Sequence, residues 1–175
     1  MELFLIVLRN IAIALAILYA LIVIVSVSFA WSFASIMSHH SHDITVILTN
    51  KRDNLIKLAE LLMSSGVKVD KKINESIHNF DLKRIEKQDG EDAKKAREEL
   101  TSYTEYFLSL DIVDKSVSNS EDYIKIIENI NELENVYRHH LMMYNADVLG
   151  YNFWIKFLPT RYIFKILRFK PKDNI

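Results

Sequence analysis

The sequence of 175 residues contains no cysteine, three glycines and two prolines. The absence of cysteine excludes disulfide bonds, thiolate zinc sites and a cysteine nucleophile. Strands and tight turns normally need more glycine and proline, so their scarcity favours long helices. The formal net charge of −1 gives no global field that would attract nucleic acid, and we expect no nucleic-acid partner.

Catalytic signatures are also missing. The sequence has no Gly-x-Ser-x-Gly, no phosphate-binding loop, no His-Glu-x-x-His and no dinucleotide-binding motif. We therefore expect that the protein is not an enzyme and needs no cofactor. No residue is assigned as catalytic, cofactor-binding or metal-binding.

The N-terminal part predicts a membrane anchor. Ile11 to Trp31 contains no charged residue and as a helix would extend about 32 Å at ~1.5 Å per residue. A bilayer has a hydrocarbon core of ~30 Å, so one transmembrane helix fits. The alternative is a cleaved signal peptide with its site at Ser28-Phe29-Ala30, but the apolar stretch exceeds the usual ~7–15 residues.

After the anchor, apolar residues recur at helical spacing. The first stripe ends at Gly66 and consists of Ile44, Leu48, Leu55, Leu58 and Leu62. The second ends near Asp89-Gly90 and consists of Ile73, Ile77, Phe80 and Ile85. The third consists of Ala93, Ala96, Leu100, Tyr103, Phe107 and Leu110. We expect an all-α fold, with a transmembrane helix at about residues 11–31 and then an antiparallel up-and-down four-helix bundle with long helices. The expected domains are the anchor (1–37), the bundle (38–158) and a basic, aromatic C-terminal segment (159–175).

The last long helix carries a heptad seam. Its members are Tyr123, Ile127, Ile130, Glu134, Tyr137, Leu141, Tyr144, Val148, Tyr151 and Ile155. Ser118-x-x-Glu121 predicts a capping box at its start, and Pro159 should end the helix at Leu158. Glu134 is the one charged seam residue, and Arg138 at i+4 could pair with it.

The dipeptide Tyr-Asn occurs twice on this helix, at Tyr144-Asn145 and Tyr151-Asn152. Both tyrosines occupy seam positions, where the ring can be buried while the hydroxyl keeps a hydrogen bond. Both asparagines lie on one flank, where the amide could bind a neighbouring helix and fix its register. We interpret the pairs as structural; the alternative is a polar groove for a ligand or partner.

These motifs resemble the LemA family of bacterial membrane-anchored helical proteins. The membrane helix is followed by Lys51-Arg52-Asp53-Asn54-Leu55-Ile56, and the end of the chain carries Tyr144-Asn145, Tyr151-Asn152, Pro159 and Phe169 in the family's order. The resemblance implies an anchored four-helix bundle in the cell (inner) membrane. It adds no catalytic residue, because the molecular function of the family is uncertain.

The sequence departs from the family pattern at three places. Lys57-Leu58 replaces the family's Pro-Asn, Leu141 stands where an Arg is usual, and Arg168 replaces the Gly before the terminal Phe. The chain is therefore interpreted as a divergent member.

Histidines form two clusters, one at His39, His40 and His42 and one at His139-His140. If the helix end near Phe157 returns beside His40, His139 lies roughly 27 Å away at ~1.5 Å per residue. One site shared by both clusters is therefore not expected. The first cluster alone has only Asp43 as a neighbouring carboxylate, so a polar collar at the membrane edge is the simpler interpretation, and metal binding there is left open.

The C-terminal segment is basic and aromatic, and residues 153–172 contain no acidic residue. A short helix returning to the bilayer would bring Lys156, Arg161, Lys165 and Arg168 to the lipid headgroups. The alternative is a helix that closes the open end of the bundle, with its cations in solvent.

Together these features predict a single-pass membrane protein that acts as a non-catalytic scaffold or adaptor in membrane-associated assemblies. Its expected partners are the lipid bilayer and either other proteins or further copies of itself. The alternative is a membrane-tethered sensor of a small molecule or metal. Lys51 and Arg52, close to the anchor, favour the cytoplasmic side for the large domain.

Overall fold

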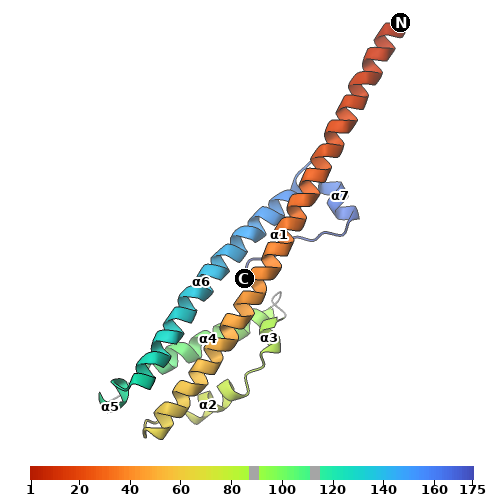
Figure 1. Ribbon diagram of the computed structural model, residues 1–175. Coiled ribbons are helices and arrows are strands. Elements are labelled where there is room, and N and C mark those ends of the chain that lie inside the picture. The colour runs from red at the N-terminus through yellow and green to blue at the C-terminus, as the bar shows by residue number, and fades with distance from the viewer. Residues whose placement is uncertain (87–90, 111–114) are drawn as a thin grey trace. The chain divides into compact units, whose positions relative to one another are not determined.

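The computed structural model describes residues 1–86, 91–110 and 115–175. The fold over these residues is all-α, as predicted, and contains no strand. The helices are α1 (Glu2–Ser64), α2 (Lys71–His78), α3 (Lys83–Glu86), α4 (Glu91–Ser109), α5 (Lys115–Ser118), α6 (Glu121–Lys156) and α7 (Arg161–Ile166), as Figure 1 shows.

The chain forms two compact units, and the two long helices contribute to both. The terminal unit comprises residues 1–38 and 144–174, and the central unit comprises residues 39–143 with Ile175. The domain boundaries predicted from composition, at residues 37 and 158, remain a prediction.

The helix α1 continues without a break because it contains neither glycine nor proline. It ends in a Schellman motif: Gly66 has a φ of 79°, the N–H of Gly66 donates to Met63 O, and the N–H of Val67 donates to Leu62 O. Gly66 is therefore the stop that the sequence predicted. Within α1, one stretch near the N-terminus is long and apolar enough to span a membrane, and the side chains of residues 1–21 are exposed.

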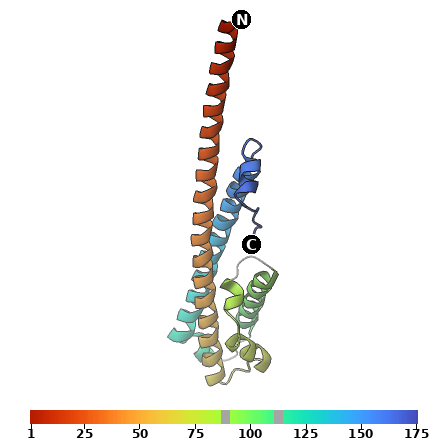
Figure 2. The ribbon, with the colours of Figure 1, turned by 90° about the vertical axis from the view of Figure 1, so that its right-hand side faces the viewer.

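The core of the central unit follows the predicted stripes. Ile44, Leu48, Leu55, Leu58 and Leu62 of α1 are buried. Buried apolar residues from the rest of this unit include Ile77, Phe80, Ile85, Ala93, Ala96, Leu100, Tyr103, Phe107, Val117 and Ile130. Figure 2 follows the same chain from a second direction.

The second predicted helix is interrupted, which corrects the expectation of one continuous stripe. Asn79 ends α2, and the side chain of Asp81 accepts a hydrogen bond from the N–H of Lys83 at the start of α3. Two short helices with a polar turn between them still bury Ile77, Phe80 and Ile85. The expected end at residues 89–90 lies outside the described residues.

The start of α6 also differs from the prediction. Ser118 is the last residue of α5, and the helix α6 is capped by Ser120, whose Oγ accepts from the N–H of Tyr123 at 3.3 Å. Serine is a favoured N-cap residue, and both Ser118 and Ser120 precede the helix. The shift of two residues leaves the seam unchanged. Every seam residue from Tyr123 to Ile155 is buried or half-buried. The helix ends at Lys156, two residues before the predicted Leu158.

In the terminal unit, the end of α6 runs antiparallel to an early part of α1. The rings of Phe29 and Trp154 stack with centroids 4.9 Å apart, and the Tyr19 hydroxyl donates to Pro159 O at 2.8 Å. The expectation that the end of this helix lies beside His40 is therefore wrong. The end of α6 and the segment after it instead contact Phe29 and Tyr19, inside the predicted span Ile11–Trp31. The unbroken run of exposed side chains in the apolar stretch is therefore residues 1–21.

Candidate functional site

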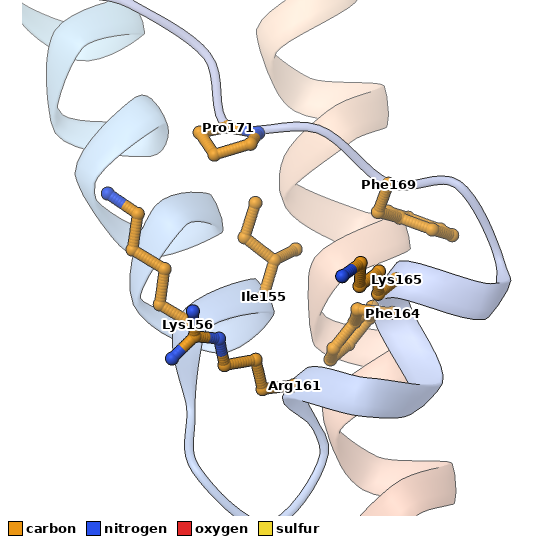
Figure 3. Close-up of a pocket in the computed structure, with 7 residues that line it drawn as sticks. All are labelled: Ile155, Lys156, Arg161, Phe164, Lys165, Phe169 and Pro171. Carbon is orange, nitrogen blue, oxygen red and sulfur yellow. The ribbon is translucent and has the colours of Figure 1, made fainter.

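Three of the four predicted headgroup contacts line a pocket of about 390 Å³ in the terminal unit (Figure 3). Lys156 comes from the end of α6, and Arg161 and Lys165 come from α7. The apolar lining consists of Ile155, Phe164, Phe169 and Pro171. Ile155 and Phe164 are buried, whereas the three cations are exposed, so positive charge surrounds an apolar floor.

The pocket is shaped by a sharp reversal of the chain after α7. The N–H of Phe169 donates to Phe164 O and the N–H of Arg168 donates to Lys165 O, the two bonds of a Schellman motif. The rings of Phe164 and Phe169 meet edge to face with centroids 5.3 Å apart. Arg168 occupies the left-handed position of this motif, with a φ of 61°, where the LemA pattern has glycine. Arg168 is exposed and does not line the pocket.

The second Tyr-Asn pair holds the chain that follows this reversal. The amide of Asn152 donates to Lys172 O at 2.7 Å and accepts from the N–H of Lys172 at 3.0 Å. Tyr151 is buried, its ring lies 6.4 Å from that of Phe169, and burial raises the pKa of its hydroxyl. Asn152 therefore binds the C-terminal tail instead of a neighbouring helix, and thereby fixes one wall of the pocket.

The remaining motif residues are buried, half-buried or bonded within the fold and do not line the pocket. Tyr144 is buried, and Asn145, the next residue of α6, is half-buried. Arg52 donates to Ile77 O and to His78 O, the carbonyls at the end of α2, where a cation also favours the helix dipole. Leu55 is buried and Ile56 half-buried.

Sequence reasoning missed Lys51 as the partner of the charged seam residue. Its Nζ lies 2.7 Å from Glu134 Oε2, and its side chain is only 1% exposed. The predicted partner Arg138 is also present, with its Nε 3.1 Å from Glu134 Oε1. Glu134 thus accepts from both cations, and a charge at a seam position was the signal that a buried cation lay opposite.

The two histidine clusters meet in the central unit, contrary to the expectation of a large separation. His40 Nδ1 lies 3.2 Å from His140 Nδ1, and His140 Nδ1 lies 3.5 Å from Asp43 Oδ2. The rings of His40 and His140 meet edge to face, with centroids 5.4 Å apart. His39 and His42, the other members of the first cluster, are exposed.

Searches against protein-family models, curated proteins and solved structures found no match to this chain. The resemblance to the LemA family therefore remains a prediction that rests on the motifs alone.

Proposed function

We propose that the protein is a single-pass membrane protein whose C-terminal basic pocket binds the headgroups of anionic lipids. The observation that carries this proposal is the convergence of Lys156, Arg161 and Lys165 on one pocket with a buried apolar floor. Lysine supplies a point charge and arginine a planar fork, and both suit a phosphate group. Lipid phosphates are the anions that a membrane-anchored chain meets at the highest local concentration.

Exposed apolar side chains near the pocket support this assignment. Leu158, Tyr162 and Ile166 of the terminal unit are 77%, 75% and 79% exposed. An exposed group of this kind is costly in water but suits the boundary between headgroups and acyl chains. The terminal unit also contains the apolar stretch of α1 that is long enough to cross a membrane.

At the level of the cell, we propose a non-catalytic scaffold or adaptor in the cell (inner) membrane, with its large domain in the cytoplasm and arranged as a LemA-like four-helix bundle. Lipid binding would hold the C-terminal end at the bilayer, while exposed helix faces bind partner proteins or further copies. Crosslinking in intact membranes, followed by mass spectrometry, tests this role. A reproducible stoichiometric partner or a self-crosslink supports it, whereas recovery of uncrosslinked monomer alone contradicts it.

The lipid-binding proposal is tested with the full-length protein in a neutral detergent. Phosphatidylglycerol should raise the melting temperature more than phosphatidylcholine does, because a ligand that binds the folded state stabilises it. The variant K156Q/R161Q/K165Q should lose this difference.

A matched control replaces three cations of the central unit, Lys57, Lys68 and Lys125, which are all exposed. The variant K57Q/K68Q/K125Q has the same net charge as the pocket variant and should retain the response to phosphatidylglycerol. An equal loss in both variants would show that only overall charge matters and would refute a defined headgroup pocket.

A further inference from the structure

Three metal-ligating atoms converge in the central unit, on two helices that are far apart in sequence. His40 and Asp43 lie one turn apart on α1, and His140 lies on α6. One ligand atom from each residue, an imidazole nitrogen or a carboxylate oxygen, lies within 4.8 Å of the other two. All three residues are half-buried, so the group is neither a solvated surface cluster nor sealed from ions.

The distances match the first coordination shell of a small ion. Two nitrogens bound to tetrahedral zinc at ~2.0–2.1 Å are about 3.3 Å apart. The Nδ1 atoms of His40 and His140 are 3.2 Å apart, and His140 Nδ1 is 3.5 Å from Asp43 Oδ2. A small movement of the Asp43 carboxylate toward the two imidazoles would bring all three ligand atoms within bonding distance of one ion.

Hydrogen bonds satisfy the close contacts among these three side chains less well than a bound cation would. The Nδ1 of a neutral imidazole carries at most one proton, so His140 Nδ1 can serve His40 and Asp43 together only by sharing that proton between two acceptors. A cation placed between the three atoms interacts with a lone pair of each at the same time. The carboxylate also supplies a negative charge that partly balances a divalent ion.

We propose that His40, Asp43 and His140 form a binding site for a divalent transition-metal ion, with zinc as the ion that fits best. Two imidazoles and one carboxylate suit zinc, whereas magnesium and calcium prefer oxygen ligands only. The protein supplies three ligands, and water takes the fourth position, as in exchangeable zinc sites. His39 Nε2 lies 3.7 Å from Asp43 Oδ2, beyond hydrogen-bond distance, and is not one of the three ligands.

Binding would join α1 to α6 within the central unit. Because the ligands come from both helices, a bound ion stabilises the state in which α1 and α6 are packed together relative to states in which the two helices separate. The three proposed ligands belong to the central unit and the basic pocket belongs to the terminal unit, so the two proposals rest on different residues and are tested separately.

The test uses full-length protein in detergent, purified with an affinity tag that contains no histidine and stripped with a chelator. Zinc sulfate is titrated by calorimetry, and bound zinc is counted after dialysis by elemental analysis. We expect one zinc per chain and a higher melting temperature. Loss of an outer-shell partner already costs metal affinity about 10–100-fold, so H40A, D43N and H140A should each weaken binding by at least about 100-fold.

Neighbouring histidines provide matched controls. H42A and H139A remove an exposed histidine next to a proposed ligand and should bind zinc as the wild type does. D43N keeps the shape of the side chain, and an unchanged circular dichroism spectrum with lost binding would support the site. No zinc in the wild type, or equal weakening in H139A and H140A, would overturn the proposal.

Discussion

Arg168 holds a backbone conformation that costs free energy in every residue except glycine. Left-handed φ angles cost an L-residue about 1–2 kcal/mol, and the φ of Arg168 is 61°. Arg168→Gly should stabilise the protein by about 0.5–1 kcal/mol, because the greater freedom of unfolded glycine offsets part of the relief. Thermal melting in detergent measures the gain. Arg168→Ala removes the same charge but keeps Cβ, so an equal gain from both variants would contradict the backbone explanation.

The ion pair between Lys51 and Glu134 should respond unequally to removal of its two members. Glu134→Gln leaves the ammonium of Lys51, 1% exposed, without its carboxylate, and an uncompensated buried charge costs about 3–5 kcal/mol. Lys51→Met leaves Glu134, 25% exposed and still paired with Arg138, and should cost less. Chemical denaturation compares the two free energies of unfolding. A larger loss of unfolding free energy in Lys51→Met than in Glu134→Gln would contradict the explanation that the unpaired Lys51 ammonium is the costly group.

The stability contributed by this pair should also disappear at acid pH. Burial raises the pKa of Glu134, but hydrogen bonds and charges from Lys51 and Arg138 outweigh it and hold the pKa below its ordinary value of 4.5. The unfolded chain therefore takes up the proton first, so acidification favours unfolding. The wild type should melt at a higher temperature than Glu134→Gln, and this difference should be largest above about pH 4.5. It should shrink as the pH falls through the pKa of Glu134 in the folded protein. A difference that is constant with pH would contradict the prediction.

At the scale of elements, Gly150 marks a close approach between α6 and α1 in the terminal unit. A Cβ at this position would lie 2.7 Å from the ring of Phe33. Gly→Ala in a helix interior normally gains about 1 kcal/mol, but here the ring must move first. We expect the full gain from Gly150→Ala only in a Phe33→Ala background and a smaller gain, or a loss, in the wild type. A double-mutant cycle of melting measurements with zero coupling would show that the two residues do not interact.

The helices themselves were predictable because apolar spacing and the rarity of glycine and proline act locally. Gly66 ends α1 as expected, and the seam from Tyr123 to Ile155 faces inward. The pairing of α1 with α6 was not predictable, because a heptad seam offers nearly equivalent alignments every seven residues. Tertiary contacts such as Phe29 with Trp154 select one alignment.

The candidate sites depend on that alignment to different degrees. Lys156, Arg161 and Lys165 are close in sequence, so their shared pocket follows from a short helix and a turn. His40 and His140 are 100 residues apart in the sequence. Their contact cannot be predicted if the alignment of α1 with α6 is wrong by a few helical turns. Lys51, the buried partner of Glu134, was missed for the same reason, whereas Arg138, one turn away on the same helix, was predicted.

At the scale of the whole molecule, the membrane side of the large domain is a prediction that rests on the distribution of charge around the apolar stretch. Lysine and arginine near a membrane helix favour the cytoplasmic side. Lys51 and Arg52 form a basic pair after the stretch, whereas Arg9 is the one basic side chain before it. The chain contains no cysteine, so single introduced cysteines report accessibility without background. Glu2→Cys and Lys57→Cys place a thiol at exposed positions before and after the expected span.

A membrane-impermeant maleimide applied to intact spheroplasts should therefore label Glu2→Cys at once and Lys57→Cys only after permeabilisation. Labelling of Lys57→Cys alone would place the large domain outside the cell and overturn the cytoplasmic assignment. Equal labelling of both thiols in intact spheroplasts would show that the apolar stretch does not cross the bilayer. To separate insertion from surface attachment, Leu15→Arg places a charge in the apolar stretch, which costs about 2.5–3.5 kcal/mol at a helix centre. It should increase release by alkaline carbonate, whereas Leu167→Arg, outside the span, should not.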